Sequence, residues 1–374
     1  MYDVPHLRFP EFSGEWERKR LKDVCNIRTG NKNTQDKSDN GIYPFYVRSQ
    51  IVERINSWTF DGEAILTAGD GVGVGKVFHY STGKIGVHQR VYILSDFKCD
   101  GKYLYSYFAG NFYNRVKRMS AKNSVDSVRM EMIADMPIAL PSIEEQKKIG
   151  HLLALLDDRI ATQNKIIEDL KKLKSAISKQ AFAQKPNGWN RLDTLFSKGK
   201  AGGTPTSTNK EYYNGEIPFL SINDITKQGK YVRYTENHLS RSGLENSSAW
   251  VVPEYSLIIS MYASVGLVTI NEVPITTSQA MFAMQLRDKD LLDYLYYYLS
   301  YFKYRHIHKY LETGTQSNIN ADIVRGIMIP TYGHSRNMKI ASTLQGIDAK
   351  IDNELSVLKL FNRQKNYLLS QMFI

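Results

Sequence analysis

The glycine-rich run at residues 69–76 is the segment whose composition comes closest to phosphate chemistry. A nucleotide-binding phosphate loop needs the pattern G-x-x-x-x-G-K-[ST]. Counting back from Gly75, the first glycine position holds Asp70, and Val77 stands where the hydroxyl residue should be. The pattern G-x-G-x-x-G fails as well, because Lys76 occupies its last position. The run therefore predicts a tight turn that presents Lys76 to a phosphate, since glycine lets the backbone turn sharply.

Patterns for catalysis and for metal binding do not appear in the sequence. The eight histidines have no zinc-site spacing, and His306 and His308 would face different ways on a helix. We find no nucleophile elbow G-x-S-x-G, no Asn/Asp-Pro-Pro-aromatic motif and no acidic–lysine nuclease cluster. Cys25 and Cys99 form no spaced set and are typical of reduced thiols. We expect no catalytic residue and no metal or cofactor on this chain; an enzyme with an unrecognised site is one alternative.

Side chains suited to reading DNA bases are present in both halves of the chain. Arginine can donate two hydrogen bonds to guanine, and asparagine or glutamine can both donate to and accept from adenine. The candidates in predicted loops are Arg48, Gln50, Lys76, Gln89, Arg90, Lys122 and Asn123, then Asn223, Tyr262, Gln279, Thr315, Gln316 and Asn318. Gln89 and Gln279 fall at matching points of an internal repeat. The alternative is that these are ordinary polar loops without function.

Basic residues also recur on the predicted helix of each half. Arg115, Lys117 and Arg118 in the first half correspond to a second cluster at residues 303–309, which ends in Lys309. Arg115, Arg118 and Lys309 are therefore candidates for contacts with DNA phosphates. A solvated helix face without a ligand is the alternative.

Two long helices are predicted from a repeat at an offset of 191 residues. Residues 149–182 match residues 340–373, and in both the apolar spacing alternates between three and four, as in a heptad seam. The predicted seam residues are Leu153, Leu156, Ile160, Ile167, Leu170 and Ile177 in the first helix and Leu344, Ile347, Ile351, Leu358, Phe361 and Leu368 in the second. Polar residues interrupt both seams at the same places, including Lys174 and Lys365. An antiparallel coiled coil is predicted; the alternative is that each helix packs on its own lobe.

The repeat continues upstream of the helices. Tyr103-Leu104-Tyr105 matches residues 294–296 at the same offset, and each half opens on a tryptophan followed by a leucine (Trp16 and Leu21, Trp189 and Leu192). In contrast, residues 144–146, Glu-Glu-Gln, find no counterpart before the second helix, which predicts a two-residue shift there.

Short apolar runs bounded by turn residues predict strands at 64–67, 91–94, 257–260 and 281–285, and aromatic helices follow near 103–119 and 291–311. The predicted fold class is α+β, with two α/β lobes and two long helices in a pseudo-two-fold internal repeat. The boundaries are 1–141 (lobe 1), 142–184 (first helix), 185–330 (lobe 2) and 331–374 (second helix).

Composition is compatible with a DNA-binding protein. The 374 residues carry a formal net charge of +11, spread along the chain, which permits nucleic-acid binding without proving it. No apolar run is long enough to span a membrane, and the first residues have no basic or apolar leader. These features predict a cytoplasmic protein.

Several segments resemble the specificity subunits of Type I restriction–modification systems. Residues 138–149 with 156–160 are similar to the central conserved region of that family; residues 202–205, 211–219 and 223–225 are similar to the opening of a target-recognition domain, and 314–319 to its closing loop. The resemblance implies a non-catalytic subunit whose two target-recognition domains each read half of a bipartite DNA site. It also implies a coiled coil that sets the gap between the half-sites.

The resemblance further implies partners and cofactors. The coiled coil and adjacent lobe surfaces would dock two modification (methyltransferase) subunits, and two restriction (motor-nuclease) subunits would complete the complex. S-adenosylmethionine, ATP and magnesium are expected on those partners. The main alternative is an assembly scaffold that grips two partner subunits without binding DNA, and salt-dependent binding of duplex DNA discriminates between the two.

Overall fold

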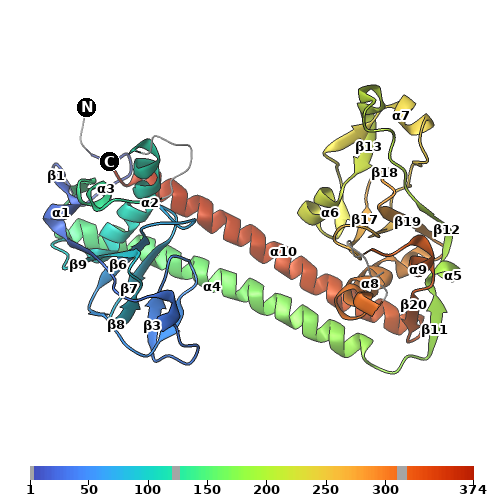
Figure 1. The fold of residues 1–374 in the computed structure, drawn as a ribbon, viewed down its shortest axis with the longest axis horizontal. Helices are drawn as coiled ribbons and strands as arrows, with labels where there is room; N and C mark the ends of the chain where they lie inside the picture. The colour runs from blue at the N-terminus through green and yellow to red at the C-terminus, as the bar shows by residue number, and fades with distance from the viewer. Residues whose placement is uncertain (1–3, 120–126, 310–317) are drawn as a thin grey trace. The chain divides into compact units, whose positions relative to one another are not determined.

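The computed structural model describes residues 4–119, 127–309 and 318–374, which form two compact units. Unit 1 comprises residues 1–165 and 355–374, and unit 2 comprises residues 166–354. Two long helices, α4 (Ile143–Phe182) and α10 (His334–Gln371), each contribute to both units. Each unit also contains a lobe of mixed helices and short strands (Figure 1).

The lobe of unit 1 contains two four-stranded sheets and a two-stranded one. Their orders are β2-β9-β6-β7, β4-β3-β8-β5 and β1-β10. The elements are β1 (Glu17–Arg20), α1 (Leu21–Val24), β2 (Asn26–Thr29), β3 (Tyr43–Tyr46), β4 (Glu53–Ile55), β5 (Phe60–Asp61), β6 (Ala64–Ala68), β7 (Phe78–Ser81), β8 (Lys84–Val87), β9 (Val91–Ser95), α2 (Gly101–Met119), α3 (Met130–Ala134) and β10 (Pro137–Leu140). Helix α2 packs against β6 and β7 and buries Tyr103, Phe108 and Phe112 in the core.

The lobe of unit 2 contains sheets of five, three and two strands, ordered β12-β19-β16-β17-β14, β15-β13-β18 and β11-β20. The elements are β11 (Gly188–Arg191), α5 (Leu192–Leu195), β12 (Phe196–Ala201), β13 (Tyr213–Leu220), α6 (Ile222–Gln228), β14 (Tyr231–Val232), β15 (Asn237–Leu239), α7 (Arg241–Glu245), β16 (Leu257–Ser260), β17 (Val268–Asn271), β18 (Thr276–Thr277), β19 (Met281–Leu286), α8 (Leu292–Arg305), α9 (Ala321–Arg325) and β20 (Met328–Thr331). The four strands and two aromatic helices predicted from the sequence are all present, as β6, β9, β16, β19, α2 and α8.

Buried tyrosines connect the aromatic helix of each lobe to the strand that precedes a long helix. The hydroxyl of Tyr103 donates to the carbonyl of Ala139 at 2.6 Å, and Tyr294 donates to Pro330 at the same distance. A second pair of tyrosines, one turn further on, repeats the arrangement, from Tyr107 to Pro137 (2.8 Å) and from Tyr298 to Met328 (3.0 Å). All four equivalences have the offset of 191 residues. The repeated tyrosines are therefore explained by a repeated tertiary contact.

The openings of the two lobes correspond at the leucines but not at the tryptophans. Leu21 and Leu192 each follow directly on the strand that pairs with the strand before a long helix, and both are fully buried. Trp16 is buried and precedes β1, whereas Trp189 lies inside β11 and is 53% exposed. The tryptophans are thus not equivalent residues.

The predicted two-residue shift at the start of the second helix is wrong. Helix α4 begins at Ile143 and α10 at His334, which is the offset of 191 again. Gln146 accepts from the backbone N–H of Asp100 at 3.0 Å, and its counterpart, the buried Asn337, accepts from the N–H of Tyr332 at 3.0 Å. The equivalence is not apparent from the sequence because the two residues differ. Asn337 has a shorter side chain than Gln146, and it accepts from a backbone N–H that is closer in the sequence.

Ion pairs join the two long helices within each unit. In unit 1, Lys365 of α10 lies 2.5 Å from Asp157 of α4, and in unit 2, Lys174 of α4 lies 2.5 Å from Asp348 of α10. All twelve predicted seam residues are buried or half-buried, and Leu153 and Leu344 are fully buried. Both lysines occupy positions where the sequence predicted polar interruptions of the seam.

We predict that Tyr103→Phe and Tyr294→Phe each destabilise the unit that contains them. Removing the hydroxyl leaves a buried carbonyl without its partner, which costs about 1–2 kcal/mol and lowers the melting temperature by about 2–4 °C per kcal/mol. Thermal unfolding followed by circular dichroism measures the effect. Tyr304→Phe is the control, because this side chain is 78% exposed; equal melting temperatures for all three variants would contradict the prediction.

Candidate nucleic-acid interface

Three connections of unit 1 come together where strands β3, β6 and β8 end. Strands β3 and β8 are parallel, and β6 ends opposite the start of β9, at the pair Ala68–Val91. We call residues 47–51, 69–77 and 88–90 loop edge 1. Backbone hydrogen bonds connect its segments to the lobe, from the N–H of Gly69 to the carbonyl of Arg90 (2.8 Å) and from the N–H of Val128 to the carbonyl of Gly69 (2.8 Å).

Unit 2 repeats this backbone framework. Strands β13 and β18 are parallel, and β16 ends opposite the start of β19. We call residues 221–223, 261–267 and 278–280 loop edge 2. The N–H of Met261 donates to the carbonyl of Ala280 (2.7 Å), and the N–H of Ile319 donates to the carbonyl of Met261 (3.0 Å). These two bonds are equivalent to the two in loop edge 1.

Most of the predicted base-reading residues lie at these two edges, and their side chains are exposed. Loop edge 1 carries Arg48, Gln50, Lys76, Gln89 and Arg90, and loop edge 2 carries Asn223, Tyr262 and Gln279. Gln89 and Gln279 are each the middle residue of a three-residue connection between equivalent strands, which confirms that they match in the repeat.

The remaining candidates lie elsewhere. Arg118 is exposed in the last turn of α2, whereas Arg115 is half-buried and its Nε donates to the carbonyl of Met132 at 2.8 Å. Asn318 is half-buried directly before the anchored Ile319. The candidates Lys122, Asn123, Thr315 and Gln316, and the side chain of Lys309, lie outside the described residues.

The glycine run of loop edge 1 forms the predicted tight turn. Gly71 and Gly75 have φ of +79° and +65°, a backbone conformation that favours glycine. A Cβ on Gly73 would lie 2.3 Å from the carbonyl oxygen of Arg48, so only glycine allows the turn to approach the 47–51 segment this closely. Lys76 is exposed, and its Nζ lies 5.5 Å from the centroid of the Tyr113 ring.

Charged side chains in loop edge 1 are organised around Asp70, a residue that sequence reasoning did not single out. One oxygen, Oδ1, lies 2.8 Å from Nη1 of Arg48, and the other, Oδ2, lies 3.6 Å from Nε of Arg90. Below them the buried His88 accepts from the backbone N–H of Arg90 through Nδ1 at 3.0 Å. Burial, and then the Arg48 guanidinium, lowers the pKa of His88, which favours the neutral imidazole that this bond requires.

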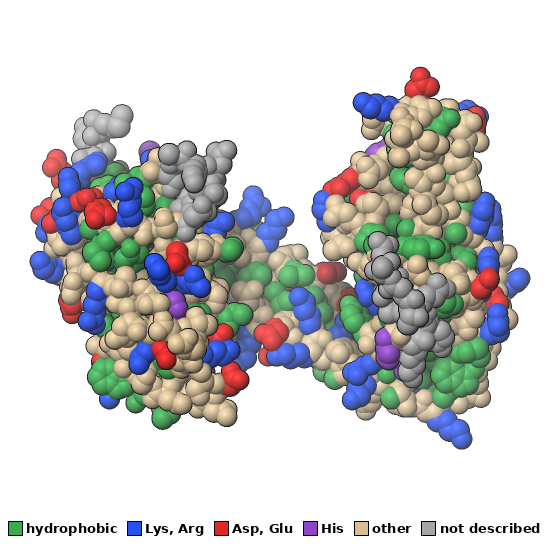
Figure 2. All heavy atoms as spheres, in the orientation of Figure 1, with side chains coloured by type: hydrophobic (Ala, Val, Ile, Leu, Met, Phe, Trp, Pro, Cys, Tyr) green, Lys and Arg blue, Asp and Glu red, His purple; other side chains and the backbone are tan. Residues whose placement is uncertain are grey.

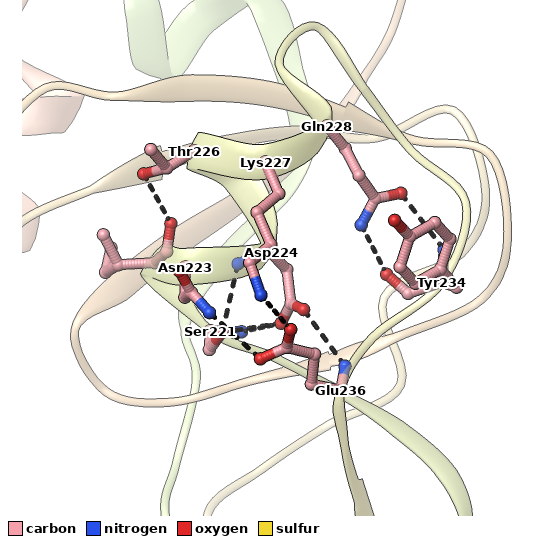
Figure 3. Close-up of polar contacts among 9 residues, drawn as sticks. Ser221, Asn223, Asp224, Thr226, Lys227, Gln228, Tyr234 and Glu236 are labelled. Carbon is pink, nitrogen blue, oxygen red and sulfur yellow. Dashed lines mark hydrogen bonds and ion pairs between the residues drawn. The ribbon is translucent and has the colours of Figure 1, made fainter. Parts of the chain in front are cut away.

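Loop edge 2 uses a buried carboxylate in a different way (Figure 3). Asp224 accepts from the N–H and hydroxyl of Ser221 at 2.8 and 2.7 Å and from the N–H of Glu236 at 3.0 Å, while Ser221 caps α6. The amide nitrogen of Asn223 donates to Glu236 at 3.0 Å, which orients the exposed amide. Gln279 accepts from the hydroxyl of Thr204. These two contacts, of Glu236 with Asn223 and of Thr204 with Gln279, were not predicted, because each joins residues that are not neighbours in the sequence.

Surface charge on the face shown in Figure 2 is mixed, with lysine and arginine interspersed with aspartate and glutamate on both units.

Within the described part of the chain, no group of three or more His, Cys, Asp or Glu side chains is placed to hold a metal ion. Among the described helices, none combines the length and apolar character needed to cross a membrane.

The family model for the Type I restriction modification DNA specificity domain matches the chain twice, at residues 13–172 and 186–359. The two matches together cover most of the chain and place one copy in each half. The chain therefore belongs to this family, and the resemblance found in the sequence is confirmed.

Individual relatives agree with the family. The specificity subunit of the Type I restriction enzyme EcoDI from Escherichia coli is 28% identical over 215 residues, 56% of this chain and 47% of that protein. The Type I restriction–modification S subunit from M. genitalium has a similar fold, with a TM-score of 0.68 at 14% identity over 99% of both chains. A chain from a type I R-M system structure has a TM-score of 0.58 at 16% identity, over 96% of this chain and 97% of that one. The chain spans about half the length of the curated relatives it matches.

We predict that Asp224→Ala loosens the 221–236 segment of loop edge 2. The substitution leaves partly buried N–H and hydroxyl donors without their acceptor, which costs about 1–2 kcal/mol. Hydrogen exchange at the amides of Ser221 and Glu236 should speed up by roughly tenfold or more. Thr226→Ala, an exposed change on the same helix, serves as the control, and unchanged exchange in Asp224→Ala would show that the carboxylate does not organise the loop.

Proposed function

We propose that this chain is the sequence-specific DNA-recognition subunit of a Type I restriction–modification complex, and that it catalyses no reaction itself. Lobe 1 (1–141) and lobe 2 (185–330) each act as a target-recognition domain and read one half of a bipartite site. The observation that carries the proposal is the pairing of one backbone framework with two different sets of exposed side chains at loop edges 1 and 2.

This pairing is what recognition of two different half-sites requires. The backbone bonds of Gly69 and Met261 hold equivalent loops in place. The side chains on those loops differ: arginine and lysine predominate at loop edge 1, and asparagine, tyrosine and glutamine at loop edge 2. Binding residues are commonly placed on loops that a rigid scaffold positions, and these residue types are those that pair with base edges.

The helices at 142–184 and 331–374 form an antiparallel coiled coil that sets the gap between the half-sites. Its pseudo-two-fold symmetry is supported by the ion pairs: Lys174 and Lys365 are equivalent, as are Asp157 and Asp348, and each lysine pairs with the aspartate of the other helix. In a pair of helices related by a two-fold axis, a residue of the first helix contacts a residue of the second, and the equivalent residues make the same contact with the helices interchanged. The two ion pairs follow this pattern.

The same helices dock two modification subunits, and two restriction subunits complete the complex. Apolar side chains exposed on the helices, including Leu173, Leu360 and Tyr367, are suited to this role. S-adenosylmethionine, ATP and magnesium belong to the partners rather than to this chain. The complex acts in the cytoplasm, where its DNA substrate lies.

The decisive test is methylation mapping by single-molecule sequencing in cells that make this chain with a cognate modification subunit. We expect a bipartite motif with a constant gap, and replacement of residues 185–330 by the lobe of another family member should change one half only. Duplex binding by the assembled complex should also weaken steeply with added salt, because phosphate contacts release counterions. Methylation that is unchanged with and without the chain, despite a properly assembled complex, would favour the assembly scaffold.

A second prediction concerns the helix pair. Lys365→Ala and Asp157→Ala should each lower stability, and the double variant should cost less than the sum, with a coupling of about 1 kcal/mol for this partly buried pair. The exchanged variant Lys365→Asp with Asp157→Lys should recover part of the loss. Chemical denaturation of the four proteins measures the coupling. The Lys172–Glu168 pair, which lies within one helix and is exposed, provides a matched cycle with smaller coupling.

A further inference from the structure

Arg48, Asp70 and Arg90 form a cluster at loop edge 1 that the lobe scaffold does not require. Arg48 is the second residue after β3, Asp70 the second after β6 and Arg90 the third after β8. The same positions after β13, β16 and β18 in unit 2 hold Ile222, Tyr262 and Ala280. The backbone bond between the loops is nevertheless kept, from Gly69 to Arg90 and from Met261 to Ala280. The cluster is therefore an addition to loop edge 1.

Stability alone is a weak reason for such a cluster. The side chains of Arg48 and Arg90 are 47% and 64% exposed, and that of Asp70 is 27% exposed. Exposed ion pairs contribute little to stability, because water already solvates both charges well. What the cluster does provide is two arginines on an exposed edge that share one carboxylate, Arg48 through a hydrogen bond and Arg90 through an ion pair at 3.6 Å.

The geometry leaves the recognition groups of both arginines available. The bond from Arg48 to Asp70 uses Nη1, so the neighbouring Nε and Nη2 donors, which form one side of the guanidinium fork, are not used by it. The contact from Arg90 to Asp70 is an ion pair at 3.6 Å through Nε, so it does not occupy the two terminal nitrogens of this arginine. Each arginine thus retains two parallel donors.

We infer that Arg48 and Arg90, positioned by Asp70, read guanine in the half-site of lobe 1. Guanine presents two acceptors, O6 and N7, on its major-groove edge, and two parallel donors match that pattern, whereas adenine offers one acceptor and one donor there. The inference rests on the proposed function and adds to it the base that lobe 1 selects.

The carboxylate argues for bases rather than phosphates as the ligands. Asp70 reduces the formal charge of the three side chains to +1 and so weakens their attraction for a phosphate, while the edge of guanine carries no net charge. A carboxylate that orients both guanidinium groups also lowers the entropy lost when they bind. Asp70 is thus a positioning residue, and the two arginines are the contacts.

The experiment selects duplexes from a randomised pool with the full chain assembled with its modification subunit. The half-site of lobe 1 is identified as the one that survives replacement of lobe 2. We expect a G·C pair in that half, and changing it to A·T should weaken binding by roughly 5- to 150-fold. Arg48→Ala, Arg90→Ala or both should abolish this discrimination, and replacing the guanine by 7-deazaguanine, which lacks N7, should weaken binding by the unsubstituted chain.

Two controls and one further variant sharpen the result. Arg20→Ala removes an exposed arginine of β1 that pairs with Asp135, and it should leave the G·C preference unchanged. Gln279→Ala should affect only the other half-site. Asp70→Asn should lower discrimination while raising affinity for unrelated duplexes, because the local charge rises and the orientation is lost; a merely structural role would give no such opposite change.

Failure of the inference is separable from failure of the proposed function. If the unsubstituted chain selects no motif, the proposed function fails. If it selects a bipartite motif in which the lobe 1 half lacks guanine, or if both arginine variants keep full discrimination, the function stands and the inference is wrong. Equal weakening on all sequences by the arginine variants would assign these residues to phosphates and would also overturn it.

Discussion

Backbone hydrogen bonds between loops are the interaction on which both lobes depend. The N–H of Gly69 donates to the carbonyl of Arg90, the residue directly before β9. The N–H of Met261 donates in the same way to the carbonyl of Ala280, the residue directly before β19. Because this hydrogen bond joins backbone groups only, it can form with different side chains at the same positions. A loop edge built in this way keeps its shape while its exposed side chains change. Two lobes with one framework can therefore present unlike surfaces.

Much of the architecture followed from the sequence because it is periodic or repeated. The heptad spacing predicted both long helices, and the offset of 191 residues predicted the equivalence of Tyr103 and Tyr294, which the structure explains by a shared contact with a buried carbonyl. The glycines of the 69–76 run predicted a turn, because residues with a side chain rarely adopt a positive φ and have no room where two backbone segments approach closely. These features depend on local or regularly spaced residues.

What the sequence did not reveal depends on pairing across the chain. Asp70 meets Arg48 from 22 positions away, and Glu236 meets Asn223 from another element, so neither contact leaves a local pattern. Asn337 was missed as the counterpart of Gln146 because equivalent roles were filled by amides of different length reaching different backbone groups. Arg115 has a second role that its position on a basic helix did not indicate: its Nε donates to the backbone carbonyl of Met132 within the lobe.

The two loop edges solve one physical problem with different chemistry. An exposed polar side chain that is to recognise a ligand must lose little conformational entropy on binding, so it needs a partner in the free protein. At loop edge 1 the half-exposed Asp70 contacts the arginines directly, and at loop edge 2 the buried Asp224 fixes the backbone of Ser221 and Glu236 while Glu236 orients Asn223. A direct ionic contact suits guanidinium groups, whose charge attracts the carboxylate. A neutral amide is attracted less strongly by a charge, and Asn223 is oriented by the hydrogen bond that its amide donates to Glu236, whose backbone N–H is bound to Asp224. The nature of the contact residue thus determines how its support is built.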